Sequence, residues 1–398
     1  MRMEISALSS INPIVANISY MVADLKYSQK HGLKICEVQH GSLSTLNGDL
    51  YVSSKENNEN FKENIGDISP KIVDFFNQFD MKKWIVGSFF KPLKICFQIS
   101  GWNTHRSIRT LTRDPDFLKY SKLIPNDPTC ISSYHGIVYA MYDTLQDVNA
   151  YRVMYPGIIF IDQVTLNYWN DKYKMNLLFD DNIELKKYKA DWKIYPRKYD
   201  LLLAERIRKE MPSDFYVIKP KSAFLSYGII VVENKDLDDT LLVILDPQSK
   251  LSRTHNDKGY NYWYNLNSKN NVFETDKNDD TFIVEKYYES DYLPLPLPCK
   301  ISNNSVSNDH EIYNYDATMR IAFILKYNNG IMTYHSMGGF WKLPLKALEE
   351  TGTLNEKRIS CCIPPFYNKV NPVLFEEINK KLEIAMLLLY ENMIKLTL

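Results

Sequence analysis

Two short apolar stretches near the start of the chain are interrupted by charged residues at regular points. Residues 18–24 and 33–39 each read as a strand, and a turn through residues 31–32 separates them. Glu37 and Gln39 are two positions apart, so on a strand they point to the same face. Asp24 falls on the preceding strand. The pattern predicts a hairpin with one aspartate, one glutamate and one amide oxygen, which is the hard-oxygen set that Mg²⁺ prefers.

A second hairpin is predicted over residues 215–232, where Val, Ile, Tyr and Phe dominate both flanks of a short polar loop. The first strand carries Lys219, and Gly228 opens the second strand. A lysine at the end of a strand, facing a loop whose backbone amides can close over it, can bind a polyphosphate. A buried hairpin with one solvated lysine would have a similar sequence. Because Gly-Lys-Ser and Gly-Lys-Thr are absent from the chain, the loop is not a Walker loop.

Apolar spacing predicts most of the remaining elements. Helices are expected over residues 70–78, 198–210 and 374–398, and strands over residues 84–90, 93–99 and 157–162. Polar stretches rich in Asn, Asp, Glu, Lys or Ser predict connections at residues 53–67, 265–280 and 302–310.

Composition narrows the class of protein. The 398 residues, 45% of them apolar, can form two or three lobes with substantial cores. Lys and Arg (48) balance Asp and Glu (48), so we expect neither nucleic acid nor a membrane as partner. The six cysteines include no Cys-x-x-Cys pair, so neither a zinc site nor a disulfide framework is expected. A reducing compartment, the cytoplasm, is the expected location. No apolar run reaches the ~18–20 residues of a membrane span, and no secretion signal is expected.

Three further segments, together with the two hairpins, resemble the circularly permuted ATP-grasp ligases, of which glutathionylspermidine synthase is the best-known type. Residues 165–179 resemble the Asp-Lys helix before the nucleotide lid, residues 281–288 the hinge strand, and residues 315–325 the segment with an Asp and then an Arg. The metal strand precedes the lid, as in the permuted family. Two departures are Gln39, where the family has Asn, and Val22, where it has Arg.

The resemblance implies a role for each matching residue. Asp24, Glu37 and Gln39 would bind Mg²⁺, while Lys219 and Arg320 would hold ATP phosphates and act in catalysis. Further ATP contacts would be Lys172 or Lys174, Lys221, Ser222, Ser226, Gly228, Glu285 and Tyr287. Substrate contacts would be His40, Ser42, Ser44 and Lys342. Ordinary structural roles stay open: a surface charge for Lys172, an exposed strand position for Glu285, a salt-bridge partner for Arg320, and burial beside Trp341 for Lys342.

The implied fold is α+β, with two lobes that sandwich ATP and a mobile lid. Its parts would be residues 1–48 (metal strands), 49–160 (substrate region), 161–199 (first ATP lysine), 200–283 (lid) and 284–398 (core and terminal helix). We expect the strand at residues 33–39 to lie beside residues 319–325, with Glu37 within roughly 10 Å of Arg320 and Lys219 in the same cleft.

The implied activity is an ATP- and Mg²⁺-dependent carboxylate–amine or carboxylate–thiol ligase that works through an acyl phosphate. Its substrate would be an amino acid or small peptide. Two alternatives remain open. One is a phosphotransferase with a hydroxyl acceptor. The other is a non-catalytic nucleotide-binding or interaction protein, favoured by the single glycine in the lid loop and by Gln39.

Overall fold

The computed structural model describes residues 16–41, 43–57, 64–79, 84–87, 90–138, 148–166, 168, 171–221, 226–246, 257–267, 280–296 and 311–397. Within these ranges the chain is a mixed α/β protein whose two largest sheets are antiparallel.

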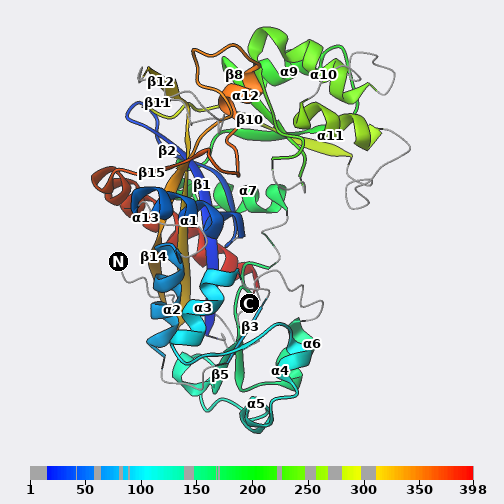
Figure 1. Ribbon diagram of the computed structural model, residues 1–398. Coiled ribbons are helices and arrows are strands. Elements are labelled where there is room, and N and C mark those ends of the chain that lie inside the picture. The colour runs from blue at the N-terminus through cyan, green and yellow to red at the C-terminus, as the bar shows by residue number, and fades with distance from the viewer. Residues whose placement is uncertain are drawn as a thin grey trace.

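A five-stranded central sheet runs along the length of the molecule (Figure 1). Its order is β15 (Tyr367–Lys369), β14 (Ile331–Lys342), β13 (Thr318–Asn328), β1 (Asn17–Ser28) and β2 (Gly32–His40). Strands from opposite ends of the sequence therefore pair, and the predicted hairpin is confirmed as β1 and β2. The predicted direct neighbourhood of residues 33–39 and 319–325 is wrong, because β1 lies between β2 and β13.

Asp24 occupies the centre of this arrangement. It pairs with Arg320 on β13 and with Glu37 on β2. Two strand spacings of about 4.8 Å therefore place the Glu37 and Arg320 backbones about 10 Å apart. Residues directly opposite each other share a face of the sheet, so all three side chains start from the same face.

The two faces of the central sheet have different covers. Met21, Ala23 and Leu25 of β1 belong to a core that includes the long helix α13 (Pro372–Thr397). Ile18, Tyr20 and Val22 point the other way, into a core with α2 (Ile68–Asn77) and α3 (Lys91–Ile99). Further along β1 this second face carries Asp24 and Lys26 instead. The apolar core ends there, and a charged region begins.

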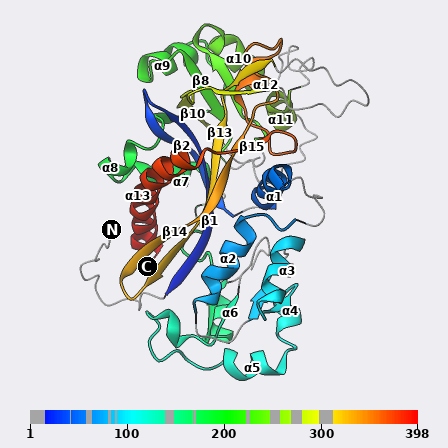
Figure 2. The same cartoon turned by 60° about the vertical axis from the view of Figure 1, so that its left-hand side comes forward.

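A four-stranded sheet forms the upper lobe in Figures 1 and 2. Its order is β7 (Trp192–Pro196), β10 (Thr281–Lys286), β8 (Phe215–Lys219) and β9 (Ile230–Glu233), which confirms the predicted hairpin at residues 215–232. Its core includes residues of α9 (Leu203–Glu210), α10 (Leu237–Leu245) and α11 (Lys258–Asn267).

The lower lobe contains two short parallel pairs. These are β3 (Trp84–Val86) with β4 (Asn103–His105), and β5 (Gly136–Val138) with β6 (Ile158–Phe160). Its helices are α4 (Ile108–Leu111), α5 (Pro115–Ser121) and α6 (Val148–Met154). The predicted strand at residues 93–99 is wrong. This segment belongs to α3, because Pro92 starts a helix and Leu93, Cys96 and Phe97 recur at helical spacing on its buried face.

The remaining elements are helices, short strands and 3₁₀ turns. They are α1 (Leu43–Asn57), α7 (Lys172–Asp180), α8 (Ile183–Lys186), β11 (Leu293–Pro296), β12 (Ile312–Tyr315), α12 (Leu354–Arg358) and the 3₁₀ turns η1 (Ile131–Ser133) and η2 (Asn234–Asp236). Helix α1 corrects the expected connection at residues 53–67, whose first residues are helical. The predicted helix at 374–398 is confirmed as α13. Among the described helices, none is long and apolar enough to cross a membrane.

Candidate functional site

A pocket lies between the two large sheets, and we call it the cleft. Its lining contains seven cations: Lys26, Lys34, Lys172, Lys219, Lys286, Lys342 and Arg358. Against these stand three carboxylates: Asp24, Glu37 and Glu285. Three of these cations have carboxylate partners outside the lining: Asp316 and Glu289 balance Lys26 and Arg358, and Asp191 pairs with Lys286. The buried cations Arg320 and Lys189 lie behind the lining and add to the remaining excess of positive charge. This excess is local to the cleft, because the chain as a whole carries no net charge. It indicates an anionic ligand.

The central sheet contributes a buried ion cluster of Asp24, Arg320 and Lys342, which we call the Asp24 cluster. Arg320 donates from Nε and Nη2 to the two Asp24 oxygens, each at 2.7 Å, and Lys342 Nζ donates to Oδ2 at 2.8 Å. Arg320 Nη1 also donates to Ser44 Oγ at 2.8 Å. The three residues are 6%, 3% and 3% exposed, so two cations share one carboxylate away from water.

In the Asp24 cluster, the Asp24 carboxylate stabilises the charged forms of Arg320 and Lys342, and both cations stabilise the charged form of Asp24. Burial alone would raise the pKa of Asp24, but Arg320 and Lys342 outweigh burial and hold that pKa well below its usual range. Burial and Arg320 lower the pKa of Lys342, and Asp24 reverses this, so the pKa is raised. All three groups are charged at neutral pH, and the cluster carries one positive charge in excess.

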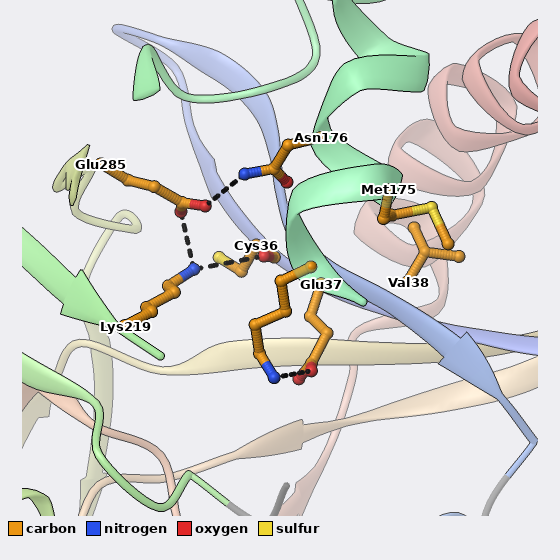
Figure 3. Close-up of a pocket in the computed structure, with 8 residues that line it drawn as sticks. Cys36, Glu37, Val38, Met175, Asn176, Lys219 and Glu285 are labelled. Carbon is orange, nitrogen blue, oxygen red and sulfur yellow. Dashed lines mark hydrogen bonds and ion pairs between the residues drawn. The ribbon is translucent and has the colours of Figure 1, made fainter. Parts of the chain in front are cut away.

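A second cluster also has one carboxylate and two cations: Glu285 of β10, Lys219 of β8 and Lys189, which precedes β7. We call it the Glu285 cluster. Lys219 Nζ lies 2.6 Å from Glu285 Oε2, and Lys189 Nζ lies 3.0 Å from Oε1. Asn176 Nδ2 donates to Oε1 at 3.2 Å. Figure 3 shows Glu285 held between Lys219 and Asn176. The exposed fractions are 3% for Glu285, 6% for Lys219 and 4% for Lys189.

The Glu285 cluster is also fixed to the central sheet. Lys189 Nζ donates to the carbonyls of Ile35 and Cys36 at 3.3 and 3.1 Å, and Lys219 Nζ donates to Cys36 at 3.4 Å. Cys36 is the extra residue of a β-bulge in β2. Burial lowers the pKa of Lys189, but its three oxygen partners match the three donors of an ammonium group, so we assign it as charged. This cluster therefore also has one excess positive charge.

Electrostatics at Glu285 mirror those at Asp24. Burial alone would raise its pKa, but Lys189 and Lys219 outweigh burial and lower the pKa from 4.5 to about 2. For Lys219, burial lowers the pKa and Glu285 outweighs it, so the pKa is raised. The open alternative of an exposed strand position for Glu285 is wrong, because the residue is buried on the central strand β10.

Lys172 and Glu37 lie in the cleft with these clusters. Their charged atoms are 3.4 Å apart, and both residues line the cleft. Lys172 is the first residue of α7, where Asp171 caps the helix by accepting from two backbone amides. Lys174, the other candidate ATP lysine, is exposed on α7 and is not part of the cleft lining. Among the two lysines, the geometry favours Lys172 for a ligand contact.

Of the other predicted site residues, some lie at the cleft and some lie elsewhere. Ser226 and Tyr287 line the cleft, and Ser44 contacts Arg320. Gln39 does not belong to the cleft lining, and Lys221 lies with its Nζ 5.6 Å from the ring centre of Tyr173. Ser42 and Ser222 lie outside the described residues.

The surroundings of His40 and Gly228 indicate structural roles in place of the predicted ligand contacts. His40 pairs with Met21, on the face that packs towards α13, and its Nε2 lies 2.9 Å from Thr165 Oγ1. It therefore projects away from the face that carries Glu37. Gly228 has φ +73°, and a Cβ there would lie 2.6 Å from a Tyr262 ring atom. A close approach and a left-handed backbone account for this glycine.

The sequence interpretation missed a third ion cluster at the cleft wall. Asp316 accepts from Lys26 and Arg358, each at 2.7 Å, and from the hydroxyl of Tyr287. Arg358 also pairs with Glu289 at 2.5 Å, so the cluster is balanced in charge. Lys26 could have been found, because it is two residues after Asp24 on one strand face. Arg358 ends helix α12, outside the central sheet, and no local sequence pattern connects it with Asp316.

Comparison with known proteins gives little further information. No family model matches the chain, and no curated protein matches it. Among solved structures, a similar chain is a glutathione synthetase-like effector from Globodera pallida in its apo form. The TM-score is 0.43 and the sequence identity 12%, over 83% of this chain and 74% of that one. This similarity is too low to carry an argument about fold or activity.

Proposed function

We propose that the cleft binds ATP and that the protein is an ATP-dependent carboxylate–amine or carboxylate–thiol ligase. The observation that supports this best is the matching imbalance of the Asp24 and Glu285 clusters. Each places two buried cations on one carboxylate, one cluster belongs to each sheet, and both reach the cleft. Buried charge without a full partner is costly. A ligand with negative charge at two separated points would compensate both clusters at once.

A nucleoside triphosphate fits both the charged and the apolar parts of the lining. Val217, Ile229 and Val231 belong to the four-stranded side of the cleft, and they offer an apolar surface for a base. The phosphates would lie towards the cations. Lys172 and Lys219 would hold the α and β phosphates, as the family resemblance implies.

The chemistry would be phosphoryl transfer followed by acyl transfer. A substrate carboxylate oxygen attacks the γ-phosphorus, the bond to the β–γ bridging oxygen breaks, and ADP leaves. An amine or thiol then attacks the acyl carbon, phosphate leaves with the bonding electrons, and the attacking group loses its proton. Such transfer requires alignment and charge neutralisation by the protein. Arg320 and Lys342 would supply the positive charge at the transferred phosphoryl group.

The oxygen donors at the cleft fit a magnesium ion in part. Asp24 and Glu37 lie opposite each other on neighbouring strands, and Mg²⁺ in nucleotide sites commonly takes one or two carboxylates with phosphate and water oxygens. In the part of the chain that the structure describes, no three His, Cys, Asp or Glu residues are grouped to hold a metal. Gln39 lies outside the cleft lining, so we assign only the two carboxylates. Magnesium would neutralise phosphate oxygens during transfer.

The test is ADP release from ATP with pooled amino acids, polyamines and small peptides, with hydroxylamine added to trap an acyl phosphate. ADP together with a hydroxamate supports the ligase, whereas ADP without a hydroxamate favours a phosphotransferase. ATP binding without turnover leaves a non-catalytic nucleotide-binding protein. No ATP binding at millimolar concentration refutes the proposal. Lys219→Met should lose turnover, and Lys193→Met, at an exposed ion pair on the same sheet, should keep it.

A further inference from the structure

We infer that Asp24 is an internal competitor for phosphate: its carboxylate holds the two cations that the terminal phosphate of the ligand needs, and ligand binding exchanges one anion for the other. The inference rests on the proposed function, because it assigns the phosphate end of the ligand to the Asp24 cluster. It adds a property that the proposed function does not contain, namely a coupling between phosphate binding and divalent-cation binding.

The hydrogen bonds of Arg320 show that its donors are directed to acceptors inside the protein. Its guanidinium directs Nε and Nη2 to Asp24 and Nη1 to Ser44. The planar fork of an arginine matches a carboxylate and a phosphate equally well. Lys342 directs its ammonium to the same carboxylate. A phosphate that binds these two cations therefore competes with Asp24 for the same two positive charges.

The position of Asp24 in the sheet places a second carboxylate beside it. Glu37 is its cross-strand neighbour on β2, and both side chains start from the same face. If a phosphate takes Arg320 and Lys342, Asp24 stays near Glu37 without its cations. Two carboxylates at close range repel each other unless a cation joins them. A divalent cation between Asp24 and Glu37 would remove this repulsion, so phosphate and cation should strengthen each other's binding.

This coupling predicts effects of opposite sign for one substitution. Asp24→Asn removes the competing charge, so metal-free inorganic tripolyphosphate should bind about tenfold tighter than to the wild type, because a neutral acceptor holds the cations less strongly. The same variant lacks one carboxylate for the divalent cation. Addition of Mg²⁺ should therefore strengthen tripolyphosphate binding to the wild type much more than to Asp24→Asn.

Isothermal titration calorimetry with tripolyphosphate, in EDTA and in Mg²⁺, tests the inference on the full chain. Glu37→Gln leaves the Asp24 cluster intact and keeps the test decisive if Asp24→Asn does not fold. Its metal-free affinity should rise less than that of Asp24→Asn, because Glu37 pairs with one cation, Lys172, at 3.4 Å. Its gain from Mg²⁺ should be lost. Glu391→Gln, at an ion pair with Lys395 on α13, is the control and should behave as the wild type.

The outcomes separate the inference from the proposed function. If the wild type binds tripolyphosphate but Asp24→Asn binds it no tighter in EDTA, the exchange is wrong and the nucleotide site stands. If Glu37→Gln keeps the full gain from Mg²⁺, the coupling is wrong as well. If the wild type binds neither tripolyphosphate nor ATP under either condition, the proposed function and the inference both fail.

Discussion

Replacing Glu285 by Gln should destabilise the fold strongly, because one carboxylate serves two buried lysines. Removing one partner of a buried ion pair typically costs ~3–5 kcal/mol. The lowered pKa of Glu285, about 2 instead of 4.5, corresponds to roughly 3 kcal/mol of stabilisation at neutral pH. We expect the free energy of unfolding at pH 7 to fall by ~3–5 kcal/mol in Glu285→Gln.

Urea unfolding followed by tryptophan fluorescence measures this loss, and pH gives it a signature. Because the folded pKa of Glu285 lies below the unfolded value, its stabilisation is complete above about pH 4.5 and is lost as pH falls towards 2. The difference between wild type and variant should shrink across that window. Glu233→Gln, at an exposed pair with Lys235 on the same sheet, should cost less than ~1 kcal/mol. A Glu285→Gln loss below ~1 kcal/mol, or one independent of pH, would refute the reasoning.

Three further outcomes are expected. Gly228→Ala should lower the free energy of unfolding by more than ~1 kcal/mol, since a methyl group would press on the Tyr262 ring; a neutral effect in urea titrations would contradict this packing. Asn355→Ala should speed hydrogen exchange at the Val231 amide, which donates to the Asn355 side chain at 2.8 Å; unchanged exchange would show that α12 does not protect β9. Burial lowers the pKa of His40 to about 3, so its ring signals in NMR should not shift between pH 8 and 5, and a midpoint near 6.5 would place His40 in water.

Local periodicity was sufficient for the elements whose signal lies within a few residues. The hairpin of β1 and β2, the hairpin of β8 and β9 and the long helix α13 all follow from such patterns. The same reasoning failed at residues 93–99, where apolar residues outweighed the helix-starting signal of Pro92. A short apolar run cannot by itself separate a strand from a buried helix.

Only part of the site could be predicted, because the sequence shows local patterns and does not show which distant residues pair. Asp24 and Arg320 are 296 positions apart, and they were connected through the order of motifs in a resembling family. Lys189 was missed because its partners include backbone carbonyls at a β-bulge. Neither a bulge nor a carbonyl acceptor has a side-chain pattern in the sequence.

The central claim is that one polyphosphate bridges the Asp24 and Glu285 clusters. Calorimetric titration with ATP tests it most directly, on the wild type, on Lys219→Met and Lys342→Met, and on the double variant. The account predicts one ATP per chain, a loss of about tenfold or more in affinity for each single variant, and no measurable binding for the double variant. Two ATP molecules per chain, or a single variant that binds ATP as tightly as the wild type, would contradict it.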